Sequence, residues 1–340
     1  MTATFAFAPG LTLGVAGQPA AVEQMRSEYG PCEVADTAPA ALEVVFGSPA
    51  GGLEARPGDV AAPGGHKTVR WHVTLGRPAE APLRAWISID GWPPAFARSL
   101  VQGYVIEPLL SIAAARTGHV LLPGAGIVAD DGLLVVIGRS RAGKSTIAAR
   151  ALANGRRVLG DDQVLVDAGG AWRPFPRRLR FYPDLAVAAP AAFARLTMGS
   201  RRQLRVRGLV STMTGGFVRP SLAVLPAELG ATWSAASVPA TRIALVERRP
   251  DVDRLVVEPA TTDRALDWAA AVLAEQRARL ASIGGATWLS TLEETASAEA
   301  RLLRSALAGI PVQAVVVPVG WTAAEGIART AAALGLEPGP

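Results

Sequence analysis

The sequence contains very little cysteine and few aromatic side chains. Cys32 is the single cysteine among 340 residues, so the chain can form neither an internal disulfide nor a cysteine-based metal cluster. Aromatic residues make up 6% of the chain, and its eight tryptophans are scattered, which is not typical of a stacking platform for nucleic acid. Because no basic patch is interleaved with aromatic residues either, we expect no nucleic-acid partner.

Long uninterrupted apolar runs are also missing. The segment 1–17 has neither the basic start nor the long apolar stretch of a signal peptide. The most apolar region, residues 105–137, is broken by charged side chains such as Glu107 and the pair Asp130 and Asp131. We therefore expect no membrane partner and a cytoplasmic protein.

The chain does have ample apolar side chains and a strong preference for arginine. It is 50% hydrophobic and only 19% charged, which favours a folded core over disorder. Of its 34 basic residues, all but Lys67 and Lys144 are arginines. Arginine suits bidentate contacts with phosphates and carboxylates, although a general compositional bias is the simpler explanation of the excess.

Hydrophobic periodicity predicts an α/β protein with two domains. Residues 1–93 read as a β-rich N-terminal domain, and the strict alternation of apolar and polar residues in 68–75 shows it best. The glycine- and proline-rich segment 48–66 reads as a loop. Residues 94–340 mix strands and helices and form the second domain, which ends in helices.

Five helices are predicted in this second part, and the last of them spans residues 322–334. The first spans about 94–117 with an interruption near Pro108, and the second spans about 144–153 and stops at Asn154–Gly155. The third starts with Thr262 as N-cap, and the fourth starts with a capping box from Thr291 to Glu294. Segment 183–238 has no clear pattern.

The stretch GRSRAGKST follows the apolar run LLVVI and precedes a predicted helix. It matches the pattern G-x-x-x-x-G-K-[ST], in which glycines let backbone N–H groups surround phosphate oxygens and lysine reaches the β- and γ-phosphates. The alternative, a chance glycine-rich turn, lacks this strand-loop-helix context. The sequence therefore predicts a triphosphate site formed by Gly138, Arg139, Ser140, Arg141, Ala142, Gly143, Lys144, Ser145 and Thr146.

Asp161 and Asp162 follow Lys144 closely enough that one helix and one returning strand separate them from the loop. One carboxylate can then coordinate magnesium, and the other can take the proton of an attacking hydroxyl. Two adjacent acids resist ionising together, which would raise one pKa. A solvated turn is the alternative. His119, before the strand pair that leads into the loop, is a third candidate, although it can equally be a packed core histidine.

Together these residues resemble the catalytic core of HPr kinase/phosphorylase and its relatives, including lasso-peptide-type kinases. The resemblance covers residues 115–167. It implies a P-loop kinase core similar to that of phosphoenolpyruvate carboxykinase, with ATP and Mg²⁺ as cofactors and transfer of the γ-phosphoryl group to a hydroxyl. It assigns catalysis to Asp161, His119 and Lys144 and the metal to Ser145 and Asp162. The matching positions are His119, Gly138, Ser140, Gly143, Lys144, Ser145, Asp161 and Asp162.

The sequence departs from this family in two places. Arg141 stands where the usual loop has its second glycine, and the downstream glycine- and glutamate-bearing segment of HPr-acting members is missing. We therefore expect another acceptor, either a serine of a peptide or protein or a small-molecule alcohol. A nucleotide-binding regulatory or assembly module with little or no kinase activity is the alternative function, and a homo-oligomer is compatible with either.

The basic segment after the two aspartates allows two interpretations. Arg177, Arg178 and Arg180 can clamp an anionic acceptor or the phosphoryl group in transfer, or they can form a solvated loop. The second basic segment, 199–208, raises the same choice between a substrate loop and a solvated surface.

Overall fold

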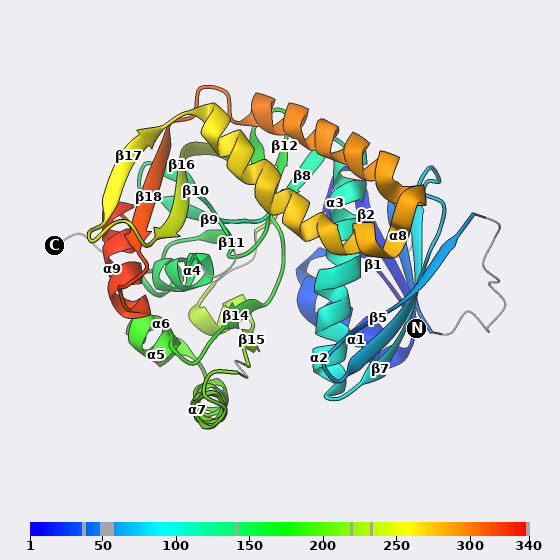
Figure 1. Cartoon of the computed structure of the whole chain (residues 1–340), viewed down its shortest axis with the longest axis horizontal. Helices are drawn as coiled ribbons and strands as arrows, with labels where there is room; N and C mark the ends of the chain where they lie inside the picture. Colours follow the sequence, from blue (N-terminus) through cyan, green and yellow to red (C-terminus); the bar gives the residue numbers. More distant parts are fainter. Residues whose placement is uncertain (36–38, 48–57, 140–141, 218–219, 232–233, 338–340) are drawn as a thin grey trace. The chain divides into compact units, whose positions relative to one another are not determined.

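The structure is a computed structural model that describes residues 1–35, 39–47, 58–139, 142–217, 220–231 and 234–337 (Figure 1). It is α/β, as the sequence predicts. The chain forms two compact units, one of Met1–Leu121 with Leu273–Leu303, the other of Leu122–Val272 with Arg304–Pro340. Residues 94–121 and 273–303, expected in the second domain, are grouped with the N-terminal strands in these compact units.

The first unit is built on one sheet of seven strands in the order β3-β1-β2-β4-β7-β6-β5. Its core is apolar because alternate strand residues face inward, so that Phe5 and Leu13 are fully buried. The strands are β1 (Thr2–Ala8), β2 (Leu11–Gly17), β3 (Glu33–Val34), β4 (Leu42–Phe46), β5 (Val60–His66), β6 (Val69–Leu75) and β7 (Leu83–Gly91).

One sequence expectation for this unit is corrected, and another, the interrupted helix, is confirmed. The predicted loop 48–66 contains strand β5, because residues 60–66 pair in antiparallel register with β6, while residues 48–57 lie outside the described residues. The helix predicted over 94–117 is interrupted at Gln102–Ile106, before Pro108, because proline fits the first turn of a helix without losing a hydrogen bond. The helices are α1 (Pro19–Tyr29), α2 (Pro94–Val101) and α3 (Glu107–Arg116).

The second unit is built on a mixed sheet whose neighbouring strands β10 (Gly132–Gly138) and β16 (Val238–Arg249) run parallel. Strand β18 (Val312–Pro318) also lies parallel to β16, with which it pairs from Ile243 to Arg249. The remaining strands of this sheet are β9 (Gly124–Ala129), β11 (Val158–Gly160), β12 (Val164–Asp167), β13 (Ala171–Pro174) and β17 (Val256–Ala260). Strand β8 (His119–Leu122) contains the boundary between the two units.

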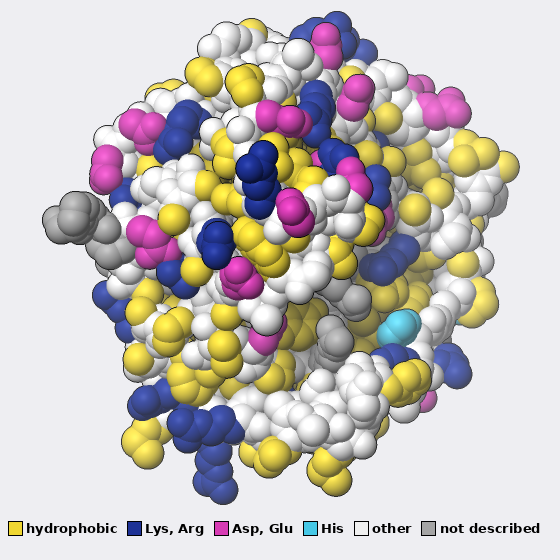
Figure 2. All heavy atoms as spheres, turned by 60° about the vertical axis from the view of Figure 1, so that its left-hand side comes forward, with side chains coloured by type: hydrophobic (Ala, Val, Ile, Leu, Met, Phe, Trp, Pro, Cys, Tyr) yellow, Lys and Arg dark blue, Asp and Glu magenta, His cyan; other side chains and the backbone are white. Residues whose placement is uncertain are grey.

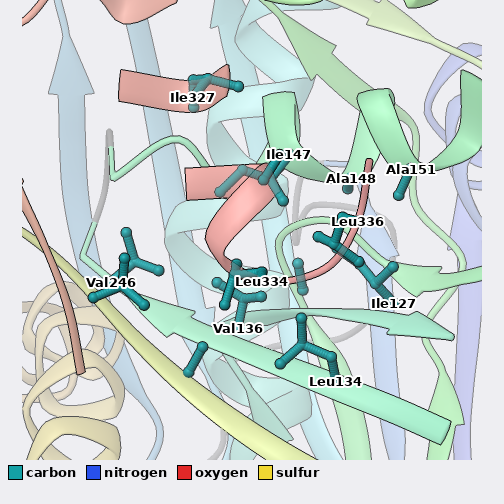
Figure 3. Close-up of a cluster of buried hydrophobic side chains, with 14 of the residues drawn as sticks. Ile127, Leu134, Val136, Ile147, Ala148, Ala151, Val246, Ile327, Leu334 and Leu336 are labelled. Carbon is teal, nitrogen blue, oxygen red and sulfur yellow. The ribbon is translucent and has the colours of Figure 1, made fainter. Parts of the chain in front are cut away.

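The helix predicted over 144–153 is confirmed as α4 (Lys144–Ala153), and its stop at Gly155 has the left-handed φ of +79°. Helix α4 and helix α9 (Ala323–Ala333) bury their apolar side chains with those of β10 (Figure 3). In this cluster Ile147 and Ala148 come from α4, and Leu134 and Val136 come from β10. The strand before the motif loop and the helix after it are therefore both anchored in one core.

The segment 183–238 has no clear sequence pattern, and its described residues contain three α-helices, a 3-10 helix (Pro226–Leu229) and one strand before β16 begins at Val238. The α-helices are α5 (Leu185–Ala188), α6 (Pro190–Arg195) and α7 (Met198–Met213), and the strand is β15 (Leu222–Val224). Strand β15 pairs with β14 (Leu179–Phe181), so part of the predicted basic loop 174–184 is a strand.

The two long helices predicted near the C-terminus are both present within α8 (Thr262–Ala306), where the non-helical backbone of Gly285 (φ 54°, ψ −153°) separates them. Thr261, not Thr262, caps this helix, because its hydroxyl accepts the N–H of Arg264 at 3.2 Å. Thr291 lies inside α8, so the predicted capping box is wrong. Within the described part of the chain, no helix joins enough length to enough apolar character to span a membrane.

Candidate functional site

The motif loop leaves β10 at Gly138 and enters α4 at Gly143. Gly143 has a left-handed φ of +98°, and a Cβ there would lie 2.3 Å from Cδ1 of Ile327. A Cβ on Gly138 would lie 2.8 Å from the carbonyl oxygen of Val246. Glycine is therefore favoured at position 143 by the left-handed φ and at position 138 by close contact with backbone. Ser140 and Arg141, two of the predicted nucleotide contacts, lie outside the described residues.

Lys144 is the first residue of α4 and is 7% exposed. Its ammonium donates hydrogen bonds to the carbonyl oxygens of Gly138 at 2.7 Å and Arg139 at 3.1 Å. The side chain thus curls back over the loop, and its charge lies next to the positive end of the α4 dipole. The positive charge of Lys144 and the positive end of the helix dipole lie at the same place, which favours binding of an anion there.

A cavity of about 840 Å³ opens beside this loop, and this volume suits a ligand of nucleotide size. All of its described lining residues belong to the second unit. They include seven predicted site residues, namely Ala142, Gly143, Lys144, Ser145, Thr146, Asp161 and Asp162.

Three other predicted residues are absent from the described lining of this cavity. Gly138 underlies the loop, and the guanidinium of Arg139 lies 5.9 Å from the ring centroid of Trp268. His119 is buried at the start of β8, where its Nδ1 is 3.4 Å from the hydroxyl of Thr117. Its catalytic role stays a prediction.

The two aspartates follow β11 in a tight bend. Adjacent residues of an extended strand point to opposite sides, which would keep one of the two carboxylates away from the cavity. At Gly160, however, the chain turns so sharply that a Cβ would lie 2.1 Å from the carbonyl oxygen of Gln163. This glycine therefore allows both Asp161 and Asp162 to line the cavity.

Asp161 is almost completely buried, with 2% of its surface exposed. Its pKa is raised to about 6, chiefly by burial and also by the neighbouring carboxylate of Asp162, while a hydrogen bond from Ser145 and the charge of Arg177 oppose the increase. The predicted pKa increase is thus present, with desolvation as its larger cause. Among the described residues, Oδ2 of Asp161 has no hydrogen-bond partner.

Asp162 differs from its neighbour because its side chain is 46% exposed and forms an ion pair. Its Oδ2 accepts a hydrogen bond from Nη1 of Arg177 at 2.6 Å, and Arg177 itself is only 10% exposed. Arg178 and Arg180 line the same cavity. The basic segment after the aspartates therefore belongs to the site, in contrast to a solvated loop.

Sequence reasoning missed several lining residues that come from distant segments. Arg248 lies near the end of β16 and donates a hydrogen bond to the carbonyl oxygen of Trp321 at 2.8 Å. Arg248 could have been assigned to the site only by knowing that β10 and β16 pair in parallel, because parallel strands end at the same edge of a sheet. The other missed groups are Tyr182, Pro183, Asp184, Leu185, Gly208, Ser211, Thr212, Val317, Ala323, Gly326, Ile327 and Thr330.

The charges around the cavity suit a polyanion bound with a metal ion. Its described lining has five cationic side chains and three carboxylates, so positive charge prevails. The described residues contain no group of three or more His, Cys, Asp and Glu that could hold a metal by themselves. Mg²⁺ needs few protein ligands when phosphate oxygens supply the others, and the Ser145 hydroxyl with the Asp162 carboxylate fits that need.

Comparisons with known proteins add no family assignment. No protein-family model matches the chain, and no curated protein matches it. The residues of the cavity and their geometry therefore carry the functional interpretation.

Proposed function

We propose that the protein is an ATP- and Mg²⁺-dependent kinase that transfers the γ-phosphoryl group to a hydroxyl. One observation carries this proposal: a buried carboxylate, Asp161, lines the same cavity as the Lys144 loop and has an oxygen without a partner in the described chain. A triphosphate on the loop would leave its γ-phosphate near this carboxylate. The buried oxygen is then available for the acceptor's proton.

In this proposal the chain's own residues mainly position and neutralise charge. The loop N–H groups and Lys144 hold the triphosphate, and Ser145 and Asp162 hold the metal. Mg²⁺, when bound, neutralises the phosphate oxygens. The acceptor oxygen forms a bond to the γ-phosphorus as the bond to the β–γ bridging oxygen breaks. The acceptor's proton passes to Oδ2 of Asp161, and ADP leaves with the bridging oxygen.

The fold that accompanies this function is a P-loop kinase core similar to those of HPr kinase/phosphorylase and phosphoenolpyruvate carboxykinase. Support comes from the order of strand β10, loop, helix α4 and short strand β11 before the aspartates. The acceptor is a peptide serine or a small alcohol in place of HPr, because the HPr-type downstream segment is missing. Incubation with labelled ATP and HPr tests this point, and efficient labelling of HPr would contradict it.

The nucleotide site is tested by replacing Lys144. We expect Lys144→Ala to weaken ATP binding by roughly 10- to 100-fold, the worth of one or two charge-assisted hydrogen bonds. Lys144→Arg should not restore it, since the planar guanidinium does not fit a loop shaped for an ammonium. Titration calorimetry measures both. Lys67→Ala is the matched control, because Lys67 is the other lysine and lies in the first unit. Wild-type affinity for ATP in the Lys144 variants would contradict the proposed nucleotide site.

A nucleotide-binding regulatory module is the competing function, and the ion pair between Arg177 and Asp162 favours it. The guanidinium neutralises a carboxylate that a kinase needs for its metal. Single-turnover measurements separate the two functions. A kinase transfers or hydrolyses the γ-phosphoryl group with Mg²⁺, whereas a module binds ATP and leaves it intact.

A further inference from the structure

Helix α7 borders the candidate site with one of its faces. Gly208, Ser211 and Thr212 line the cavity, and Leu204 is the one buried side chain of the helix. Residues three, four and seven positions apart share a helix face, so these four residues form the inward side of α7. Whatever binds along this helix is therefore close to the cavity that contains Asp161.

The opposite face of α7 is apolar and exposed. Val206, Leu209, Val210 and Met213 follow the spacing of one helix face and are 51%, 65%, 38% and 86% exposed. We call these four residues the outer stripe. Figure 2 shows hydrophobic and basic side chains side by side along its lower edge, at the height of α7 in Figure 1. Contiguous exposed apolar side chains of this kind mark interaction surfaces.

The charge of α7 is entirely positive. The helix contains Arg201, Arg202, Arg205 and Arg207 and has no acidic residue. Arg205 lies over the ring of Phe193, and Arg207 donates a hydrogen bond to the carbonyl oxygen of Ser221. A second copy of this helix would bring like charges together, so charge complementarity disfavours self-association and requires an acidic partner.

We propose that the outer stripe and its arginines dock an acidic, amphipathic peptide segment that carries the acceptor hydroxyl. The proposal rests on the kinase function proposed above and names its substrate class. The stripe has the i, i+3, i+4 and i+7 spacing by which one helix recognises another apolar face. A peptide docked there must continue around α7 to the cavity rim formed by Gly208, Ser211 and Thr212 for its serine hydroxyl to approach Asp161. A membrane surface could cover the stripe but could not enter the cavity.

The test uses two designed peptides of about 18 residues, long enough to form a helix on binding. One has leucines on one face, glutamates on the other and a single serine near its end, and the second has lysines in place of the glutamates. Fluorescence anisotropy without nucleotide measures their binding to the full chain. We expect the wild type to bind the glutamate peptide at least tenfold more tightly than the lysine peptide.

Two double variants probe the surface. Leu209→Ser with Met213→Ser should weaken binding of the glutamate peptide at least tenfold. Arg201→Glu with Arg202→Glu should reverse the preference toward the lysine peptide. Val187→Ser is the matched control, because Val187 is an apolar side chain of α5 that is 70% exposed. Circular dichroism verifies that each variant is folded. Substitutions on the surface of α7 and α5 are expected to leave the fold intact.

Several results would overturn the docking surface. They are equal affinity for the two peptides, binding that survives both double variants, and attachment to vesicles of phosphatidylcholine and phosphatidylglycerol that the variants abolish. A wild-type dimer that Leu209→Ser with Met213→Ser dissociates would assign the stripe to self-association. ATP titration of the same samples keeps the two proposals apart. If the protein binds ATP but gives any of these results, the docking proposal fails and the proposed kinase function stands. If it binds the glutamate peptide but not ATP, the proposed kinase function fails, and with it the peptide's role as acceptor.

Discussion

Two buried carboxylates in different parts of the molecule have opposite surroundings. Glu299 in α8 is 1% exposed and Asp161 is 2% exposed, and burial raises the pKa of both. Oε1 of Glu299 accepts a hydrogen bond from the hydroxyl of Ser111 at 2.8 Å, and Oε2 pairs with the guanidinium of Arg277. Oδ2 of Asp161, in contrast, has no partner in the described chain.

The difference is the one expected between a structural acid and the functional acid that we propose Asp161 to be. A buried charge destabilises a fold unless ions and hydrogen bonds compensate it, and Arg277 with Ser111 provides this compensation for Glu299. Asp161 has only a partial compensation, from a hydrogen bond with Ser145 and the charge of Arg177. The free-energy cost of a buried, partly compensated carboxylate is tolerated at sites of binding or catalysis, because a bound ligand or a transferred proton offsets that cost.

The largest expected effect concerns Glu299. Glu299→Gln should lower the free energy of unfolding by about 3 kcal/mol, because it leaves the buried guanidinium of Arg277 without a counter-charge. Urea titration measures this change. The double variant Glu299→Leu with Arg277→Met should regain most of the loss. ATP affinity should stay at the wild-type value in both, and a loss of ATP binding would erase the contrast with Asp161.

The next effect concerns phosphoryl transfer. Asp161→Asn should reduce the single-turnover rate by about 10² or more, the usual worth of a positioned base, while Mg²⁺–ATP affinity stays nearly unchanged. Asp162→Asn should also weaken the magnesium-dependent part of ATP binding. Affinity with and without magnesium, followed by rapid quench, measures both. A wild-type rate in Asp161→Asn would shift the role of base to His119 or to a group of the substrate.

A smaller effect of opposite sign concerns stability. The pKa of Asp161 is about 6 in the folded protein against an ordinary value of 3.8, so the folded state binds the proton more tightly. Stability due to this group therefore falls as the pH rises from about 4 to about 6. Asp161→Asn should raise the free energy of unfolding by about 1–3 kcal/mol at pH 7, with little difference below pH 4. Unfolding titrations across this pH range test it, and a destabilised variant at pH 7 would make Asp161 structural, like Glu299.

The smallest effect compares the two serines. Ser111→Ala removes one hydrogen bond to Glu299 and should lower stability by about 1 kcal/mol without affecting ATP. Ser145→Ala removes the hydrogen bond that lowers the pKa of Asp161, so the pH at which transfer activity rises should move upward. It should also weaken magnesium-dependent ATP binding. Identical behaviour of the two variants in both assays would contradict the division into structural and functional acids.

Local sequence patterns predicted much of the candidate site. The motif from Gly138 to Ser145 joins a strand to a helix over adjacent residues, so its local structure depends on short-range preferences such as the left-handed φ of Gly143. The helix over 144–153 and its stop followed from the same kind of signal. Segment 183–238 gave no such signal because its helices are short or, as in α7, carry their apolar residues on the exposed face.

By itself, the sequence determined the α/β class, the motif loop and the proximity of the two aspartates, because one helix and one short strand leave the chain little freedom between them. Only the tertiary structure decided that Arg248, Tyr182 and the inward face of α7 line the same cavity. It also decided that Asp161 is buried and Asp162 only half-buried, although the two are neighbours. These outcomes depend on pairings between distant strands, such as β10 with β16, and on the packing of α9 against the loop, which no local pattern encodes.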